Sequence, residues 1–439
     1  MAKAALPNQF EIGVVGLDPC GRHLARAMAG QLLSVAAYDR NAANIKELQE
    51  EARGVSIHIA ASMTQFMGLL RQCRTIVVSG PDGAGDLYGD LLEQLEAGDL
   101  LIDAGNCHFK DCERRARLLA ERNIRHLGMG VIGGGEDGSC GPVLMVGGRL
   151  ETYRGVLPLL ESMASREEGG PCVSWLGPAG AGHFVKMIHD GIEYGLTQLV
   201  VETFGLLKRA LVLDEDELRD VASAWQMGAL KGRPRDDAAR WTCQAAQELE
   251  APSPTIAAAA GMRTLSELEK RNDFAATPFR QPLGRFGDDT ESILDELHGA
   301  LRAANLITYA QGMAVLAAGS ERYGFDIDPG EVIRLWKGCG HSRAALLEEI
   351  ATAIGATPNL PNLLYDDDLS GKVMQQQERL RHAVWRAGLL QRPVPALMAS
   401  LDYLDTYRGA WLPVNLIQVR ARSALSRHSL RALSAADQE

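Results

Sequence analysis

The stretch Ile12-Gly13-Val14-Val15-Gly16-Leu17-Asp18-Pro19-Cys20-Gly21 joins a short apolar run to a helical pattern that begins at Arg22. Gly16 and Gly21 hold the first and last positions of a GxGxxG-like turn. There the first glycine permits a tight turn, and the last allows the helix to pack closely on the strand. Asp18 replaces the middle glycine, and its carboxylate is expected to repel a phosphate held at the helix N-terminus. The stretch predicts a strand–turn–helix unit of the kind that binds dinucleotides.

The segments around this turn alternate between strand and helix up to about residue 180. Apolar or β-branched runs predict strands at residues 10–15, 34–38, 75–78 and 100–102. Amphipathic patterns predict helices at residues 22–32 and 41–53. Such alternation is typical of a parallel sheet with helices on both faces. We therefore expect an α/β Rossmann-type, dinucleotide-binding domain over residues 1–180.

From about residue 181 the strand signal almost disappears. Patterns rich in Ala, Leu, Glu and Arg predict long helices at residues 182–210, 288–319 and 371–389. Segments that contain Pro and Gly predict exposed connections at residues 232–237 and 274–289. We expect a large all-α domain over residues 181–412 and a short C-terminal tail over residues 413–439.

The overall composition narrows the class of protein. The 439 residues include 45 Lys and Arg against 56 Asp and Glu, and the net charge of −11 disfavours nucleic acid and anionic membranes as partners. The eight cysteines form no CxxC pair, which argues against a zinc ribbon or a disulfide framework and fits reduced thiols in the cytoplasm. We expect no metal, no signal peptide and no membrane span.

The second predicted strand ends in Tyr38-Asp39-Arg40-Asn41, about 23 residues after Gly16. An acidic residue at this place binds the hydroxyls of the adenosine ribose, whereas a nearby arginine accommodates a 2′-phosphate. Because both residue types are present, this motif alone leaves the choice between NAD and NADP open.

A second glycine-rich turn opens the long helix of residues 182–210, in the sequence Gly177-Pro178-Ala179-Gly180-Ala181-Gly182-His183-Phe184-Val185-Lys186. Lys186, Asp190 and Glu193 follow at i, i+4 and i+7 and share one helix face, with His189 beside them. The pattern alone favours a solvent-exposed face of ion pairs, and it is also compatible with an acid–base constellation in a cleft.

The whole helix sequence, from Gly180 to Gly195, resembles the GAGHFVKMVHNGIEYG signature of the 6-phosphogluconate dehydrogenases, the decarboxylating enzymes of the pentose phosphate pathway. Further motifs resemble those of the family in the same order: residues 16–21 (GLAVMG), 39–41 (NRT), 103–106 (DGGN), 134–142 (GGEEG…GP), 307–312 (ISYAQGF) and 412–418 (LPANLIQ). These matches extend over nearly the whole chain.

The resemblance implies an NADP-dependent oxidation of 6-phosphogluconate, with loss of CO2 to give ribulose 5-phosphate in gluconate utilisation. It implies that Lys186 is the base and then the acid, and that Glu193 protonates the enediol carbon. The implied substrate-binding residues are Asn106, Gly133, Gly134, Gly135, His189, Asp190, Tyr194, Arg263, Arg427 and His428. The implied cofactor-binding residues are Gly16, Leu17, Asp18, Gly21, Asp39, Arg40, Asn41, Val78 and Asn106. It also implies a homodimer in which the C-terminal tail contributes to the partner's site.

The chain departs from the family pattern at several of these places. The family's SGG is Gly133-Gly134-Gly135, its helix Asn is Asp190, and a phosphate-binding Lys is replaced by Asp236, whereas Arg263 is kept. Near the C-terminus the family's Arg and His align with Ala421 and Arg427, and a shift of one residue would restore cationic groups. The basic residues of this tail could equally form a solvated helix face.

These departures leave two alternatives to an active 6-phosphogluconate dehydrogenase. The first is a paralogue that oxidises a different β-hydroxy acid, since Asp236 would oppose a phosphate dianion. The second is a catalytically silent relative that binds nucleotide as a regulator. Retention of both Lys186 and Glu193 argues against the silent relative, and NAD stays open as a second cofactor.

Overall fold

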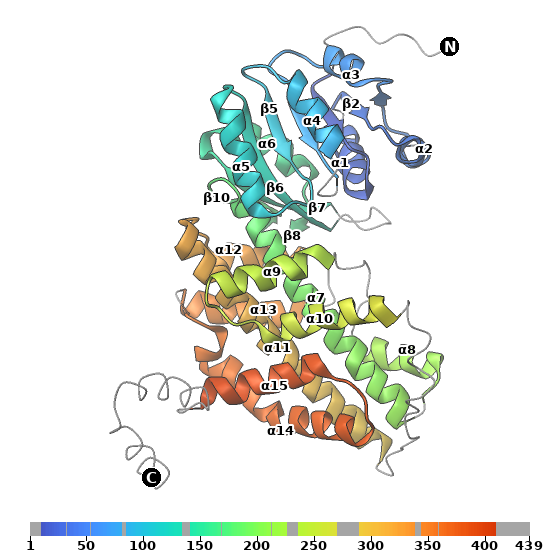
Figure 1. Ribbon diagram of the computed structural model, residues 1–439, viewed down its shortest axis with the longest axis vertical. Coiled ribbons are helices and arrows are strands. Elements are labelled where there is room, and N and C mark those ends of the chain that lie inside the picture. The colour runs from blue at the N-terminus through green and yellow to red at the C-terminus, as the bar shows by residue number, and fades with distance from the viewer. Residues whose placement is uncertain are drawn as a thin grey trace.

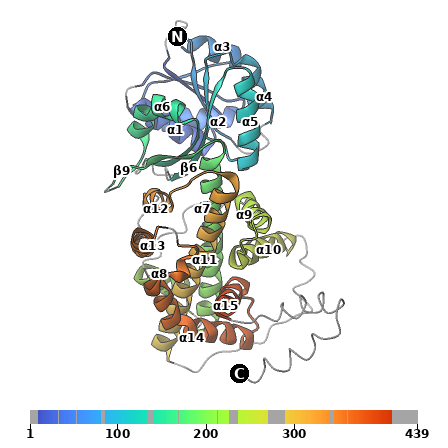
Figure 2. The same ribbon diagram turned by 90° about the vertical axis from the view of Figure 1, so that its left-hand side faces the viewer.

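The computed structural model describes residues 10–31, 33–52, 54–80, 85–133, 141–167, 169–211, 213–225, 236–269, 289–338, 344–358 and 360–409. A sheet with its covering helices forms one end of the molecule, and helices alone form the other (Figure 1). Helix α7, Ala181–Ala210, runs from the sheet into the middle of the helical part, where α9 and α10 lie on one side of it and α12 on the other (Figure 2). Within the described residues, no helix combines the length and apolarity needed to span a membrane.

In the part of the chain that the structure describes, the main sheet has eight strands in the order β10-β7-β6-β5-β4-β1-β2-β3. Their bounds are β1 Ile12–Val15, β2 Val35–Tyr38, β3 Ile57–Ile59, β4 Thr75–Val78, β5 Leu100–Asp103, β6 Arg125–Gly133, β7 Pro142–Gly148 and β10 Val173–Gly177. The first six strands are parallel, in the doubly wound order of dinucleotide-binding domains. A separate small hairpin consists of β8 Arg166–Glu167 and β9 Gly170–Pro171.

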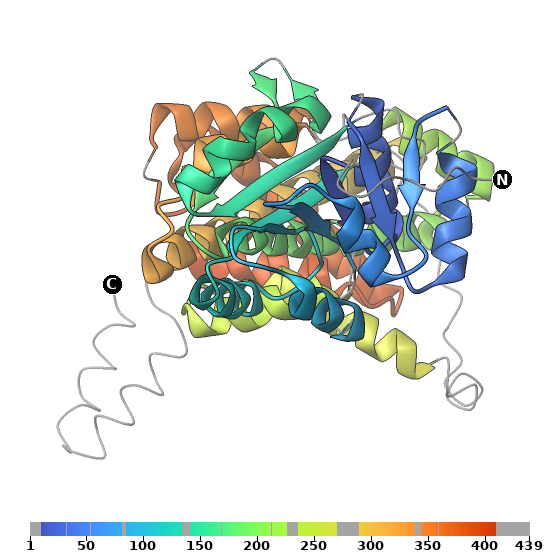
Figure 3. The same cartoon turned by 90° about the horizontal axis from the view of Figure 1, so that it is seen from above.

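The described residues before β10 form six helices, and helices lie on both faces of the sheet when the molecule is seen from above (Figure 3). They are α1 Pro19–Gly30, α2 Ala42–Glu51, α3 Met63–Leu69, α4 Gly85–Gln94, α5 Phe109–Glu121 and α6 Leu150–Met163. The helical part adds α8 Glu215–Ala224, α9 Asp236–Glu248, α10 Pro254–Glu269, α11 Thr290–Tyr323, α12 Pro329–Lys337, α13 Ala344–Ala356, the short 3-10 helix η2 Leu363–Tyr365, α14 Asp367–Leu389 and α15 Pro395–Arg408. The Rossmann-type fold followed by an all-α region is confirmed.

Three details differ from the expectations. The sheet is not wholly parallel, because β7 returns antiparallel to β6 and β10 then runs parallel to β7. Helix α1 begins at Pro19 rather than at Arg22, since Asp18 caps it and proline is favoured in the first turn. Asp236 and Asp237, expected in an exposed connection, are the first residues of α9. The spacing of apolar residues does not locate the first residue of a helix, because a helix cap is a local hydrogen bond and leaves no periodic pattern.

Helix α7 joins the two parts through close backbone packing and an aromatic cluster. A Cβ added to Gly130 on β6 would lie 2.6 Å from the carbonyl oxygen of Gly182 and 2.7 Å from Cβ of Lys186. Next to this contact, the ring of Phe184 lies 5.1 Å from that of Phe109 on α5 and 5.9 Å from that of Tyr323 on α11. The packing fixes the first turns of α7 against the sheet, and with them the position of Lys186.

Candidate active site

The turn after β1 is built from backbone that only glycine can supply. Gly16 has a φ of +84°, and a Cβ added to it would lie 1.8 Å from the carbonyl oxygen of Ser79. Asp18 does not extend away from the turn: its Oδ1 accepts hydrogen bonds from the backbone N–H of Gly21 at 2.9 Å and from the Ser79 hydroxyl at 2.7 Å. The carboxylate is therefore the N-cap of α1 and is held against the end of β4.

The predicted cofactor residues after β2 have different surroundings from one another. Asp39 is buried, and its carboxylate accepts hydrogen bonds from the backbone N–H groups of Leu17 at 2.6 Å and Asn41 at 2.7 Å. It therefore ties the turn after β1 to the turn after β2. Arg40 instead lies at the surface, where its guanidinium pairs with Asp90 on α4. Since Val78 ends β4 beside them, these residues gather at the carboxyl ends of three neighbouring strands, where doubly wound sheets bind ligands.

The polar face of α7 meets the loop after β5 at the junction of the two parts. The Lys186 amine contacts the carboxylate of Asp190 and lies 3.4 Å from Oδ1 of Asn106. His189 Nδ1 donates to the other oxygen of Asp190 at 3.2 Å. The side chains of Lys186, His189 and Asp190 are only 15%, 12% and 16% exposed, so these groups form a largely buried polar cluster and not a solvated helix face.

The charge of Asp190 is set by this environment. Burial opposes ionisation of the carboxyl, but the adjacent Lys186 ammonium and the hydrogen bond from His189 outweigh it and lower the pKa of Asp190 to about 2. Asp190 is therefore a carboxylate at neutral pH. The family signature quoted above has an uncharged asparagine at this position, so the cluster contains a charge that the signature lacks.

A buried ion pair supports the loop that carries Asn106. Asp103, at the end of β5, accepts a hydrogen bond from Arg115 on α5 at 2.9 Å and another from the backbone N–H of Gly105 at 3.1 Å. His183 on α7 donates from Nε2 to the carbonyl oxygen of Gly105 at 3.1 Å. The N–H and the carbonyl of Gly105 are thus both hydrogen-bonded, and this fixes the position of the neighbouring Asn106 next to Lys186.

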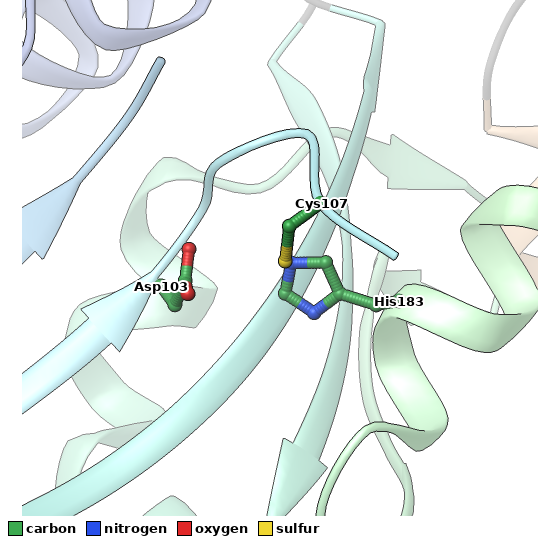
Figure 4. A group of neighbouring side chains, drawn as sticks. All are labelled: Asp103, Cys107 and His183. Atoms are coloured by element: carbon green, nitrogen blue, oxygen red, sulfur yellow. The ribbon is translucent and has the colours of Figure 1, made fainter. Parts of the chain in front are cut away.

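Asp103, Cys107 and His183 converge from β5, the following loop and α7, with a carboxylate oxygen, the thiol sulfur and an imidazole nitrogen within 4.8 Å of one another (Figure 4). Such donors are typical of zinc sites. Here, however, the carboxylate already accepts from Arg115 and Gly105. The imidazole donates from Nε2 to Gly105, and its Nδ1 has no hydrogen-bond partner among the described residues. Because the Arg115 charge also opposes a second cation beside Asp103, we interpret the cluster as support for the loop.

The remaining predicted site residues that the structure describes lie on α7, at the end of β6 and on α10. Glu193 follows Asp190 by one helical turn, and Tyr194 is buried against Ala239 and Ala259. Gly133 ends β6 with a φ of +77°, and Arg263 lies on α10, which packs against α7. Gly134, Gly135, Arg427 and His428 lie outside the described residues, as does the side chain of Asp236.

The sequence reading missed several residues that shape the site. Ser79, just after β4, contacts Asp18, and Asp90 on α4 contacts Arg40. Both are far from their partners in sequence, so no local pattern marks them. Arg115 has no motif of its own on α5. Asp103 and His183 could have been found, because each belongs to a quoted family motif and stands next to a residue that was named.

We expect Arg115→Ala to lower the free energy of unfolding by about 3 kcal/mol or more, because it leaves the Asp103 carboxylate buried without its charged partner. The matched control is Arg114→Ala, which removes an exposed pair with Asp111 on the same helix and should cost less than about 1 kcal/mol. Urea denaturation followed by circular dichroism measures both values. Equal losses for the two variants would contradict the supporting role of the Asp103–Arg115 pair.

Comparison with known proteins agrees with this architecture. The model of the NAD binding domain of 6-phosphogluconate dehydrogenase matches residues 11–177, and that of the 6-phosphogluconate dehydrogenase C-terminal domain matches residues 182–232 and 235–433. The chain is 34% identical to the NADP(+)-dependent, decarboxylating 6-phosphogluconate dehydrogenase of Bacillus subtilis (strain 168), over 94% of this chain and 95% of that one. It is 35% identical to the decarboxylating enzyme of Synechococcus elongatus, over 93% and 94% of the two chains.

Among solved structures, that of Plasmodium falciparum 6-phosphogluconate dehydrogenase superimposes with a TM-score of 0.83 at 27% identity, and covers 93% of this chain and 95% of the other. That enzyme is described in its apo form, with its cofactor NADP+ and with its substrate 6-phosphogluconate. Two family models that together match most of the sequence, and relatives above 30% identity along nearly its full length, establish that this chain belongs to the 6-phosphogluconate dehydrogenase family.

Proposed function

We propose that the chain oxidises 6-phosphogluconate with NADP and decarboxylates the product, giving ribulose 5-phosphate, CO2 and NADPH. The observation that carries the proposal is the contact between Lys186 and Asn106, which joins the helical part to the carboxyl edge of the sheet. It places a basic side chain next to the loops where a doubly wound sheet binds a nicotinamide cofactor. The decarboxylating relatives named above support the same reaction.

The cofactor fits the carboxyl edge of the sheet. Gly16 permits the tight turn after β1, because a larger residue there would collide with the backbone of Ser79, and Arg40 can reach a 2′-phosphate from the surface. Asp39 has a structural role in joining two turns, so its presence does not by itself favour NAD. NADP, when bound, supplies the hydride acceptor.

We assign the proton transfers to two residues of α7. Lys186 accepts the proton of the 3-hydroxyl as the hydride leaves carbon 3, and returns a proton to the ketone oxygen as CO2 departs. Glu193 donates a proton to the carbon of the resulting enediol. Asn106, whose amide oxygen faces the Lys186 amine, keeps that amine directed toward the cofactor side of the junction. His189, Tyr194 and Arg263 are proposed to hold the sugar acid and its phosphate.

We expect Lys186→Met to abolish turnover, by at least about a thousandfold, because it removes the group assigned to take the hydroxyl proton. NADP affinity should change little, since the methionine stem keeps the packing on β6, whereas the thermal midpoint should fall because the largely buried Asp190 carboxylate loses its ammonium partner. Lys208→Met, an exposed position near the end of the same helix, is the matched control and should keep full activity. Turnover by the Lys186 variant would refute the assigned mechanism.

Arg40→Ala should weaken NADP binding by about tenfold or more and leave NAD binding nearly unchanged, because only NADP carries the phosphate that pairs with the guanidinium. Isothermal titration of both nucleotides measures the difference. Arg71→Ala serves as the control, because Arg71 pairs with Glu11 before β1, at the opposite end of the strand from Gly16. Equal weakening of NAD and NADP would show that Arg40 is no phosphate clamp.

We also propose a cytoplasmic homodimer whose C-terminal tail contributes to the partner's site. Large apolar side chains that stay exposed on α14 and α15, among them Met374, Trp385 and Met398, support an interface on this side. The described cysteines are free thiols, which fits a reducing compartment. Light scattering should give twice the chain mass of 47.4 kDa. An active monomer would exclude the shared site.

A further inference from the structure

The contact between Lys186 and Asp190 is a feature of this chain that the assigned chemistry does not require. Asp190 lies one turn after Lys186 on α7, and one of its oxygens contacts the Lys186 amine while the other accepts from His189 at 3.2 Å. All three side chains are largely buried. An ion pair in such a place is poorly screened by water and salt, so it influences the protonation of both partners far more than a surface pair does.

The protonation states around this pair follow from its neighbours. Burial opposes the ionised form of Asp190, yet the pKa of this carboxyl falls to about 2 beside Lys186 and His189, so the carboxylate is present throughout the neutral range. His183, one turn before, is buried and its pKa is lowered by that burial, so it is uncharged at neutral pH. Asp103, beyond Gly105, is paired with Arg115.

Several charged side chains on the other elements around the pair have partners of their own. On β6, Gly130 packs against the stem of Lys186 and carries no charge. In the loop after β5, the neutral amide of Asn106 faces the Lys186 amine. On α12, the ring of Trp336 lies against His189, and Arg334 and Lys337 pair with Glu331 and Glu348. Arg240 on α9 pairs with Asp237, and Glu193 lies on α7 itself. Within the described residues, Asp190 is the carboxylate in contact with the Lys186 amine.

We propose that Asp190 is the counter-ion of Lys186 in the free enzyme, and that its charge sets the lower pH limit at which Lys186 can act as a base. This inference rests on the proposed function for its effect on catalysis. A lysine accepts a proton only as the neutral amine, and a contacting carboxylate favours the ammonium form. Asp190 is thus a positioning residue that acts through Lys186, and it makes this chain require a higher pH than an asparagine at the same place would.

The test compares unmodified protein with Asp190→Asn, which keeps the size and an amide oxygen for Lys186 and removes only the charge. The first readout is kcat/KM for 6-phosphogluconate with NADP against pH, whose acid limb reports the ionisation of the free enzyme's base. The acid limb should move to lower pH by about one unit or more in the variant. The matched control is Asp368→Asn, which removes the carboxylate of an exposed Lys–Asp pair, also four residues apart, on α14 and should move nothing.

The second readout does not depend on activity. Lysines of the full chain are reductively methylated with 13C-formaldehyde, which keeps their charge, and the Lys186 resonance is assigned by its loss in Lys186→Arg. Its titration midpoint should also move to lower pH in Asp190→Asn, by about the same amount, and stay in place in Asp368→Asn. Circular dichroism of both variants checks that the fold is kept.

The outcomes separate the two claims. A movement of both readouts in Asp190→Asn supports the proposal. An unchanged Lys186 midpoint overturns it, whatever the activity. A midpoint that moves while the acid limb does not would overturn the claim that this charge sets the pH limit. If neither protein turns over 6-phosphogluconate but the midpoint moves, the counter-ion role stands and the proposed function fails.

Discussion

The close approach of α7 to β6 is the constraint on which the site depends. Only glycine at position 130 lets the helix backbone at Gly182 and the stem of Lys186 rest directly on the strand. Because α7 also forms the middle of the helical part, a single rigid element carries the basic side chain from one part of the molecule to the sheet edge of the other. The aromatic rings of Phe109, Phe184 and Tyr323 pack beside this contact and stabilise it.

Next to this contact, the buried pair of Asp103 and Arg115 positions the loop after β5, which carries Asn106. The carboxylate of Asp103 is held by Arg115 and holds Gly105 in turn, so the carbonyl and N–H of this residue are both fixed. An ion pair of this kind contributes little net stability compared with an apolar pair, but it is costly to break, which makes it suited to fixing one loop conformation. On α7, Asp190 adds a charge that the family signature lacks, and so changes the electrostatics at Lys186 without changing the fold.

The sequence alone predicted the Rossmann-type sheet, the long helix α7 and the face that Lys186 and Asp190 share, because these follow from periodicity, glycine turns and family motifs. It could not decide whether that face is solvated, since its burial depends on the loop after β5, 80 residues before it, and on α12, more than a hundred residues after it. It assigned Asp18 a repulsive role, whereas Ser79, 61 residues away, and Gly21 bind the carboxylate as a helix cap. The antiparallel direction of β7 could not be predicted either, because a buried strand has the same apolar pattern whether it runs parallel or antiparallel to its neighbour.

The measurement that tests the account most directly is the stoichiometry of the reaction. Purified protein is mixed with 6-phosphogluconate and NADP, and NADPH absorbance and released CO2 are recorded over the same time course. Both products should appear together and in equal amounts. NADPH without CO2 would contradict the decarboxylating function, and the absence of both from protein that still binds NADP would contradict the assigned substrate.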